Sequence, residues 1–137
     1  MINIFLSCSS KDHDFIKGVI DDLTVLSDKY RLIYFLQPYN VDTPMEYILE
    51  RLSDTDLFIV FISNSSLESI YVRSELNEAI RLYQLGYIRE ICSIIIDPNI
   101  QKDKEYRIPQ CILNNNVFCS ESQSMAADIA RNFILKY

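Results

Sequence analysis

The sequence predicts an open α/β sheet of about five parallel strands with helices on both of its faces. Short apolar runs alternate along the chain with segments of helical periodicity, which is the order of elements in α/β folds. Most of these runs are continuously apolar, as is typical of strands that are covered on both faces. The chain has 137 residues, and we expect a single domain over residues 1–137 with one hydrophobic core.

The predicted strands are four compact apolar runs and one weaker run. They are residues 2–6, 32–36, 57–62 and 91–96 and, more weakly, residues 117–119. Residues 97–110 form the most polar and irregular stretch between them. We expect a surface loop there, which joins the fourth strand to the fifth and could contain a short helix.

The predicted helices lie between the strands and carry apolar residues at helical spacing. Their stripes span residues 16–23, 45–52, 72–83 and 126–133. Ser9 with Asp12 offers a capping box before the first helix. Thr43 and Pro44 supply a cap and a first-turn proline for the second. Gly86 ends the third, as a C-terminal glycine would.

Glycine and charge counts exclude several kinds of ligand site. The chain contains only two glycines, whereas average usage would give about ten. Phosphate-binding loops and dinucleotide fingerprints need clustered glycines, because the backbone must approach phosphate closely, and neither can form here. Thirteen Lys and Arg against nineteen Asp and Glu give a net charge of −6. We therefore expect no binding to nucleic acid or to an anionic membrane.

The cysteines indicate free thiols rather than a metal site. Cys8, Cys92, Cys111 and Cys119 are separated by 84, 19 and 8 positions, and His13 is the only histidine. No pair has the close spacing of a zinc or redox motif, so we expect no bound metal. No apolar stretch approaches membrane-spanning length, and the opening apolar run is too short for a signal peptide. A reducing cytoplasm fits these features best.

Three polar segments follow predicted strands and are expected to meet at one edge of the sheet. They are residues 7–12, 37–43 and 63–69. Ligands of open α/β sheets collect beyond the carboxyl ends of the strands, and each segment leads into a helix N-terminus, which favours anions. The first and third segments are rich in serine, and Lys11 adds a positive charge. The alternative is that these serines are only helix caps.

Glu75 is the candidate functional acid. It lies at the margin of the apolar stripe of its helix and has no basic residue three or four positions away. Glu78, by contrast, has Arg81 three positions further on and is expected to face outward. An unpaired carboxylate beside an apolar stripe and near a strand-end cleft is a candidate for catalysis. The alternative is a partly solvated surface glutamate.

Two other α/β classes are excluded by the strand ends. A phosphate-accepting receiver domain needs adjacent acids after its first strand, whereas the first strand here ends in Ser7, Cys8, Ser9 and Ser10. A serine hydrolase needs glycines that flank its nucleophile and a histidine nearby. No candidate serine here has either.

Three motifs, in order along the chain, resemble those of the Toll/interleukin-1 receptor (TIR) domain family. Residues 5–12, FLSCSSKD, resemble its first box, F-I-S-Y-S-x-x-D. Residues 57–63, LFIVFIS, resemble its third strand, which ends in a serine. Residues 69–76, SIYVRSEL, resemble its S-x-W-C-x-x-E-L signature. The order and intervals agree over essentially the whole chain.

The resemblance implies a flavodoxin-like sheet and one of two roles. Many TIR domains of the bacterial type are enzymes that consume NAD⁺, often in antiviral or cell-death responses. They break the nicotinamide–ribose bond and release nicotinamide with ADP-ribose or a cyclic form of it, and NAD⁺ is a substrate rather than a cofactor. Other TIR domains are noncatalytic adaptors that act by homotypic association.

The resemblance also implies residue roles. The family's catalytic glutamate matches Glu75, and Tyr71 matches the aromatic residue that stacks near the nicotinamide. The remaining expected substrate contacts are Ser7, Cys8, Ser9, Ser10, Lys11, Tyr39 and Ser69. The expected protein partners are other TIR domains, through self-assembly, and a fused or separate sensor domain.

The chain departs from the family pattern at a few positions. Tyr71 replaces the usual Trp, and Val72 replaces the usual Cys. The glycine common before the second helix is absent ahead of Pro44, and so is the R-D-x-x-P-G box of animal signalling members. The missing box favours the enzyme over the adaptor.

Overall fold

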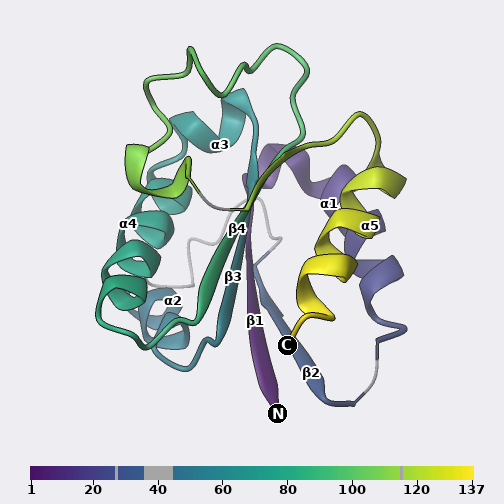
Figure 1. Cartoon of the computed structure of the whole chain (residues 1–137), viewed down its shortest axis with the longest axis vertical. Helices are drawn as coiled ribbons and strands as arrows, with labels where there is room; N and C mark the ends of the chain where they lie inside the picture. The colour runs from purple at the N-terminus through teal and green to yellow at the C-terminus, as the bar shows by residue number, and fades with distance from the viewer. Residues whose placement is uncertain (27, 36–44, 115) are drawn as a thin grey trace.

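A five-stranded parallel sheet separates two layers of helices (Figure 1). The computed structural model describes residues 1–26, 28–35, 45–114 and 116–137. The strand order is β2-β1-β3-β4-β5, and every pairing is parallel. The strands are β1 (Ile2–Ser7), β2 (Tyr30–Tyr34), β3 (Leu57–Ile62), β4 (Glu90–Ile95) and β5 (Val117–Cys119). This is the flavodoxin-like order, and it confirms the predicted fold class.

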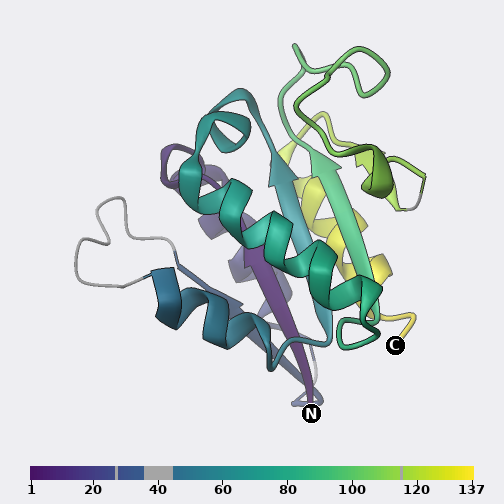
Figure 2. The same ribbon diagram turned by 90° about the vertical axis from the view of Figure 1, so that its left-hand side faces the viewer.

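The helices divide between the two faces of the sheet. One face is covered by α1 (His13–Leu23) and α5 (Gln123–Ile134). The other is covered by α2 (Met45–Leu52) and α4 (Ile70–Gln84), and Figure 2 shows α4 lying diagonally across it. The short α3 (Asn64–Glu68) follows β3, and η1 (Ser10–Asp12) precedes α1. In the described ranges, no helix combines the length and the apolar character needed to cross a membrane.

Three strands differ from their predicted bounds: β1 extends one residue further than 2–6, β4 lies one residue earlier than 91–96, and β2 differs most. The second strand begins and ends two residues before the predicted 32–36, because Tyr30 and Arg31 pair with Ile2 and Asn3 of β1 at the exposed edge of the sheet. The helix α3 was not predicted, since five residues are too few to show a helical period. The irregular stretch after β4 leads into a 3₁₀ turn, η2 (Gln110–Ile112).

Alternation along the central strands sorts side chains between the two layers, because successive residues of a strand point to opposite faces. Phe5 and Phe58 pack in the cluster under α2 and α4. Leu6 and Ile59 pack in the cluster under α1 and α5. Ser7 is therefore on the α4 side of β1, two residues after Phe5.

Ser7 belongs to a row of three side chains on that side. In the register of the sheet, Val60 of β3 pairs with Ser7 on one side and with Ser93 of β4 on the other. Ser7 and Ser93 are both buried, at 1% and 0% exposure. Ser7 donates a hydrogen bond to a side chain of α4, whereas the Ser93 hydroxyl has no partner among the described residues.

The two glycines have separate structural reasons. A Cβ on Gly18 of α1 would lie 2.0 Å from the amide nitrogen of Gln123, which crosses from α5 and donates to the carbonyl of Phe15 at 2.9 Å. Gly18 thus allows α1 and α5 to approach closely. Gly86 has φ +86° and follows the end of α4, which confirms the predicted helix stop.

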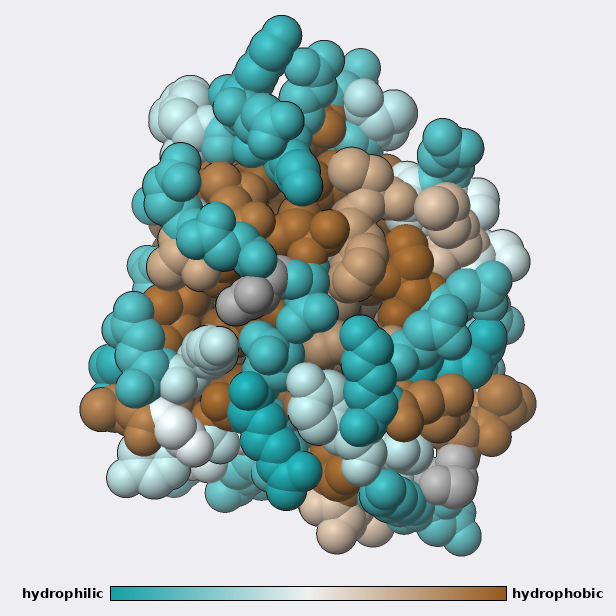
Figure 3. Space-filling view, in the orientation of Figure 1, coloured by the Kyte–Doolittle hydropathy of each residue, from teal (hydrophilic) through white to brown (hydrophobic). Residues whose placement is uncertain are grey.

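The outer strand β5 leaves one edge of the sheet partly uncovered. Phe118 is 36% exposed, and Cys119 beside it is also exposed. Figure 3 shows apolar residues at the surface in the centre of this view, between hydrophilic ones.

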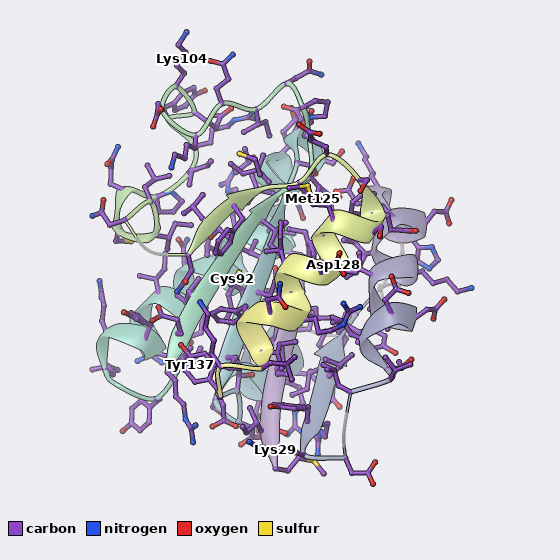
Figure 4. The ribbon with its side chains drawn as sticks, turned by 45° about the vertical axis from the view of Figure 1, so that its right-hand side comes forward. Lys29, Cys92, Lys104, Met125, Asp128 and Tyr137 are labelled. Atoms are coloured by element: carbon purple, nitrogen blue, oxygen red, sulfur yellow. The ribbon has the colours of Figure 1, made fainter. Side chains whose placement is uncertain are left out.

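The C-terminal residue is held near the start of β2. Lys29 donates to the carbonyl of Tyr137 at 2.9 Å, and Figure 4 labels both.

Prediction for the buried serines. We expect Ser93→Ala to leave the free energy of unfolding unchanged or to raise it by up to about 1 kcal/mol, because a buried hydroxyl without a partner is unfavourable. Ser63→Ala, which removes the N-cap of α3, should lower it by about 1 kcal/mol. Urea denaturation of both variants tests this. A larger loss for Ser93→Ala than for Ser63→Ala would contradict it.

Candidate active site

The candidate site lies where the strand order reverses. The chain passes from β1 outward to β2 and then returns to β3 on the other side of β1. Such a switch point leaves a crevice beyond the carboxyl ends of the two central strands. Here β1 ends at Ser7, and Ser63 directly follows β3. In Figure 1, α3 and the start of α1 lie at this upper end of the sheet.

Glu75 of α4 is held at this crevice by Ser7, the last residue of the N-terminal strand β1. The Ser7 hydroxyl donates to Oε1 of Glu75 at 2.8 Å, a contact between residues 68 positions apart. Glu75 is only 5% exposed, so the alternative of a partly solvated surface glutamate is wrong. Glu78, in contrast, forms the expected ion pair with Arg81. Oε2 of Glu75 has no hydrogen-bond partner among the described residues.

Burial controls the protonation of Glu75. Removal from water raises the pKa of this carboxyl from its ordinary value of 4.5 to about 7, and the hydrogen bond from Ser7 lowers it. Within the described ranges, no lysine or arginine forms an ion pair with it. A carboxyl of this kind changes charge near neutral pH, which is a frequent property of catalytic acids and bases.

Cys8 follows Ser7 but packs in the opposite direction. Its side chain contacts the cluster under α1 and α5, because it is the next residue along the extended chain. Burial, together with the negative charges of Glu75 and Asp12, raises the pKa of the Cys8 thiol to about 12. The thiol therefore stays neutral beside the carboxylate.

Hydrogen bonds tie the loops around the crevice together. The Ser63 hydroxyl donates to Oδ2 of Asp12 at 2.6 Å, which joins the loop after β1 to the start of α3. The Asn64 backbone N–H donates to Oδ2 of Asp97 at 3.1 Å, which adds the loop after β4. Asp12 and Ser63 were not among the predicted site residues, although both lie within the sequence motifs quoted above. Their pairing could not be read from the sequence, because 51 positions separate them.

Only one of the two hydrogen bonds of the capping box predicted at Ser9 and Asp12 is present. The Ser9 hydroxyl accepts from the backbone N–H of Lys11 at 3.2 Å and caps the 3₁₀ turn η1. The Asp12 carboxylate does not return to the backbone of Ser9; it accepts from Ser63. A tertiary partner has replaced the local one.

The other predicted contacts differ in burial and lie in η1 or at the start of α4. Ser69 is the N-cap of α4, with its hydroxyl accepting from the backbone N–H of Val72 at 3.3 Å. Ser10 is half-buried in η1, and Lys11 is exposed. Tyr71 lies on α4 one turn before Glu75 and is 47% exposed. Ser9, Ser63 and Ser69 therefore act as helix caps, and the binding roles predicted for Ser9 and Ser69 stay predictions.

The second polar segment cannot be placed in this site. Residues 37–43, with Tyr39 and the predicted cap Thr43, lie outside the described residues, as does Pro44. The second helix is described from Met45. The role of Tyr39 stays a prediction.

A cavity of about 280 Å³ lies between α3, α4 and the loop after β4, and neither Ser7 nor Glu75 is among its lining residues. Its walls are mostly apolar, and Arg73 and Arg107 contribute its cationic groups. Arg107 forms an ion pair with Glu105 at 2.9 Å. No cluster of three His, Cys, Asp or Glu suited to a metal occurs in the part of the chain that the structure describes.

Comparison with protein families identifies the family of the chain. The model of the TIR domain matches residues 4–129, from β1 into α5. The chain belongs to the TIR domain family. A search of curated proteins found no match. TIR domains include NAD⁺-cleaving enzymes and noncatalytic adaptors, and the match does not distinguish between these roles.

Prediction for the thiols. All four cysteines of this TIR domain are free; Cys111 and Cys119 are exposed, while Cys92 lies on β4 beside α5 (Figure 4). Burial raises the pKa of Cys8 and of Cys92 to about 12. Since the thiolate is the reactive form, a thiol reagent at pH 8 should modify Cys111 and Cys119 first, as mass spectrometry of digests would report. Modification of Cys8 at the rate of Cys119 would contradict this.

Prediction for stability against pH. Between about pH 4.5 and pH 7 the Glu75 carboxyl ionises in the unfolded chain but not in the folded one, so its contribution to stability falls as pH rises through this window. The Glu75→Gln side chain does not ionise, so its stability does not fall in this window, and its amide oxygen can still accept from Ser7. The variant should match the parent near pH 4 and exceed it at pH 8 by on the order of 3 kcal/mol.

Urea denaturation of parent and variant at pH 4 and pH 8 measures this difference. The effects of all other titrating groups on the free energy of unfolding cancel in this difference, because the two proteins share those groups. A difference between the proteins that stays constant with pH would show that Glu75 titrates normally.

Proposed function

We propose that this TIR domain is an NAD⁺ glycohydrolase with Glu75 as its catalytic residue. It would break the bond between nicotinamide and ribose and release nicotinamide with ADP-ribose or a cyclic ADP-ribose. The observation that carries the proposal is the buried Glu75 carboxyl at the β1/β3 switch point, held by Ser7 with its second oxygen unpaired among the described residues. Membership of the TIR family supports the same reaction.

The chemistry needs a carboxylate and little else. When the bond from ribose C1′ to the nicotinamide nitrogen breaks, its electron pair stays on nicotinamide, which leaves neutral. The ribose becomes cationic, and a nearby carboxylate stabilises that charge. Water then adds to C1′ and loses a proton. No general acid is required, so one carboxyl in a poorly hydrated site suffices, and its low dielectric strengthens the interaction.

The proposed substrate contacts follow from their positions around Glu75. The half-exposed ring of Tyr71, one turn before Glu75, is available to stack on nicotinamide. Lys11 is exposed at the mouth of the first loop and suits the pyrophosphate. Ser10 and Ser69 complete the walls of the proposed site. Tyr39 is proposed as a contact on the family resemblance alone.

We also infer that assembly regulates the activity. TIR enzymes usually act when several copies associate, so the proposed partners are other TIR domains and a sensor domain that brings them together. Antiviral or cell-death signalling in the cytoplasm would be the setting. The alternative function is a noncatalytic TIR scaffold, which would associate in the same way and leave NAD⁺ intact.

Prediction for catalysis. The protein should release nicotinamide from NAD⁺ at high concentration, or when fused to an oligomerising partner, as measured by chromatography. Glu75→Gln should lower the rate at least about 100-fold, because the charge that stabilises the cation is lost. Glu78→Gln, on the same helix but paired with Arg81, should retain the parental rate within about twofold.

The rate should also rise with pH through about 7, as Glu75 ionises. Equal rates for Glu75→Gln and the parent would refute the role of Glu75. Association without nicotinamide release in any assembled state would favour the scaffold.

A further inference from the structure

Ser7 is too deeply buried to bind substrate in the way its place in the motif suggests. It is the last residue of the central strand β1 and is 1% exposed. It pairs in parallel with Val60 of β3, and Leu6 before it pairs with both β2 and β3, so the backbone at this point is held by the sheet. The side chain faces α4, where its hydroxyl reaches Oε1 of Glu75 at 2.8 Å. Among the residues that the structure describes, the hydroxyl thus bonds only to the candidate catalytic group.

Ser93 shows that the packing of this layer does not by itself require the contact. Ser93 is on the same face as Ser7, at the same level, on the other side of Val60. It is equally buried, yet its hydroxyl has no partner among the described residues. The two serines differ in that a carboxylate lies within hydrogen-bond distance of Ser7 and not of Ser93.

The contact leaves Glu75 half satisfied. Ser7 is the only hydrogen-bond donor to Glu75 in the described part of the chain, and it engages Oε1 alone. A single bond from a rigid strand restricts rotation of the carboxylate and leaves Oε2 free. On the β1 side, the Cys8 thiol interacts electrostatically with the carboxylates of Glu75 and Asp12. Neither the thiol nor Asp12 supplies a positive charge.

We propose that Ser7 is a positioning residue: its hydroxyl fixes Oε1 of Glu75 so that Oε2 is presented to the ribose of NAD⁺ as an oriented carboxylate. This inference rests on the proposed function. It reassigns Ser7 from substrate contact to support of the catalytic group. Burial raises the pKa of Glu75 and the Ser7 hydrogen bond lowers it, so the same hydroxyl favours the ionised form of the carboxyl.

Prediction for Ser7. Carbon-13 NMR titration of the glutamate carboxyls reports the ionisation of Glu75, whose signal is identified by its loss in Glu75→Gln. In Ser7→Ala the titration midpoint of Glu75 should move upward by at least about one pH unit, because a hydrogen bond to the charged form is lost. The midpoint of the pH–rate profile for nicotinamide release should move with it. At pH 7 kcat should fall about tenfold, while KM stays within about twofold.

Matched variants separate this role from packing. Ser93→Ala removes a buried hydroxyl from the same layer and should leave both midpoints unchanged. Ser7→Thr keeps the hydroxyl and should restore both. Ser7→Cys keeps the volume with a much weaker donor, so it should resemble Ser7→Ala even if the alanine variant folds poorly.

The outcomes distinguish this inference from the proposed function. An unshifted Glu75 titration in both Ser7→Ala and Ser7→Cys overturns the positioning role, whether or not the parent cleaves NAD⁺. Equal shifts in Ser93→Ala overturn it as well, since they would reflect packing. A parent that leaves NAD⁺ intact in every assembled state overturns the proposed function, while a shifted titration would still support control of Glu75 by Ser7.

Discussion

A parallel sheet covered on both faces is the constraint on which the rest of this structure depends. Each central strand must bury both rows of its side chains, and successive residues are sent to opposite layers. The result is visible at the end of β1, where Ser7 faces α4 and the next residue, Cys8, packs toward α1 and α5. The site therefore takes its hydroxyl from the strand and its carboxylate from the helix above it.

The same edge of the sheet is built with serine where many nucleotide-binding folds use glycine. Ser9, Ser63 and Ser69 each cap a helical turn through their hydroxyls. Side-chain capping satisfies the free backbone N–H groups at these helix starts, so those groups are not all left open to a phosphate. This agrees with the exclusion of a glycine-rich phosphate loop. The candidate site therefore depends mainly on one carboxylate, that of Glu75.

Burying that carboxylate has a structural cost. At neutral pH Glu75 is held where water cannot fully hydrate its charge, and burial raises its pKa to about 7. Such a group destabilises the folded state when ionised. The Ser7 hydrogen bond offsets part of this effect. A buried acid that weakens the fold while lying at the switch point is the pattern expected where stability is lost in favour of function.

The sequence by itself determined the class of fold and the approximate span of most elements, and it indicated Glu75 as the candidate functional acid. Apolar runs and helical stripes are local patterns, so residues 57–62 could be recognised as a strand with no knowledge of its neighbours. Local patterns failed where the element was short, as in α3, or where an edge strand used polar residues, as at Tyr30 and Arg31. Only the tertiary structure decided that Ser7 meets Glu75 and that Asp12 meets Ser63. Strand order and register bring these residues together across 68 and 51 positions, and no spacing along the chain encodes them.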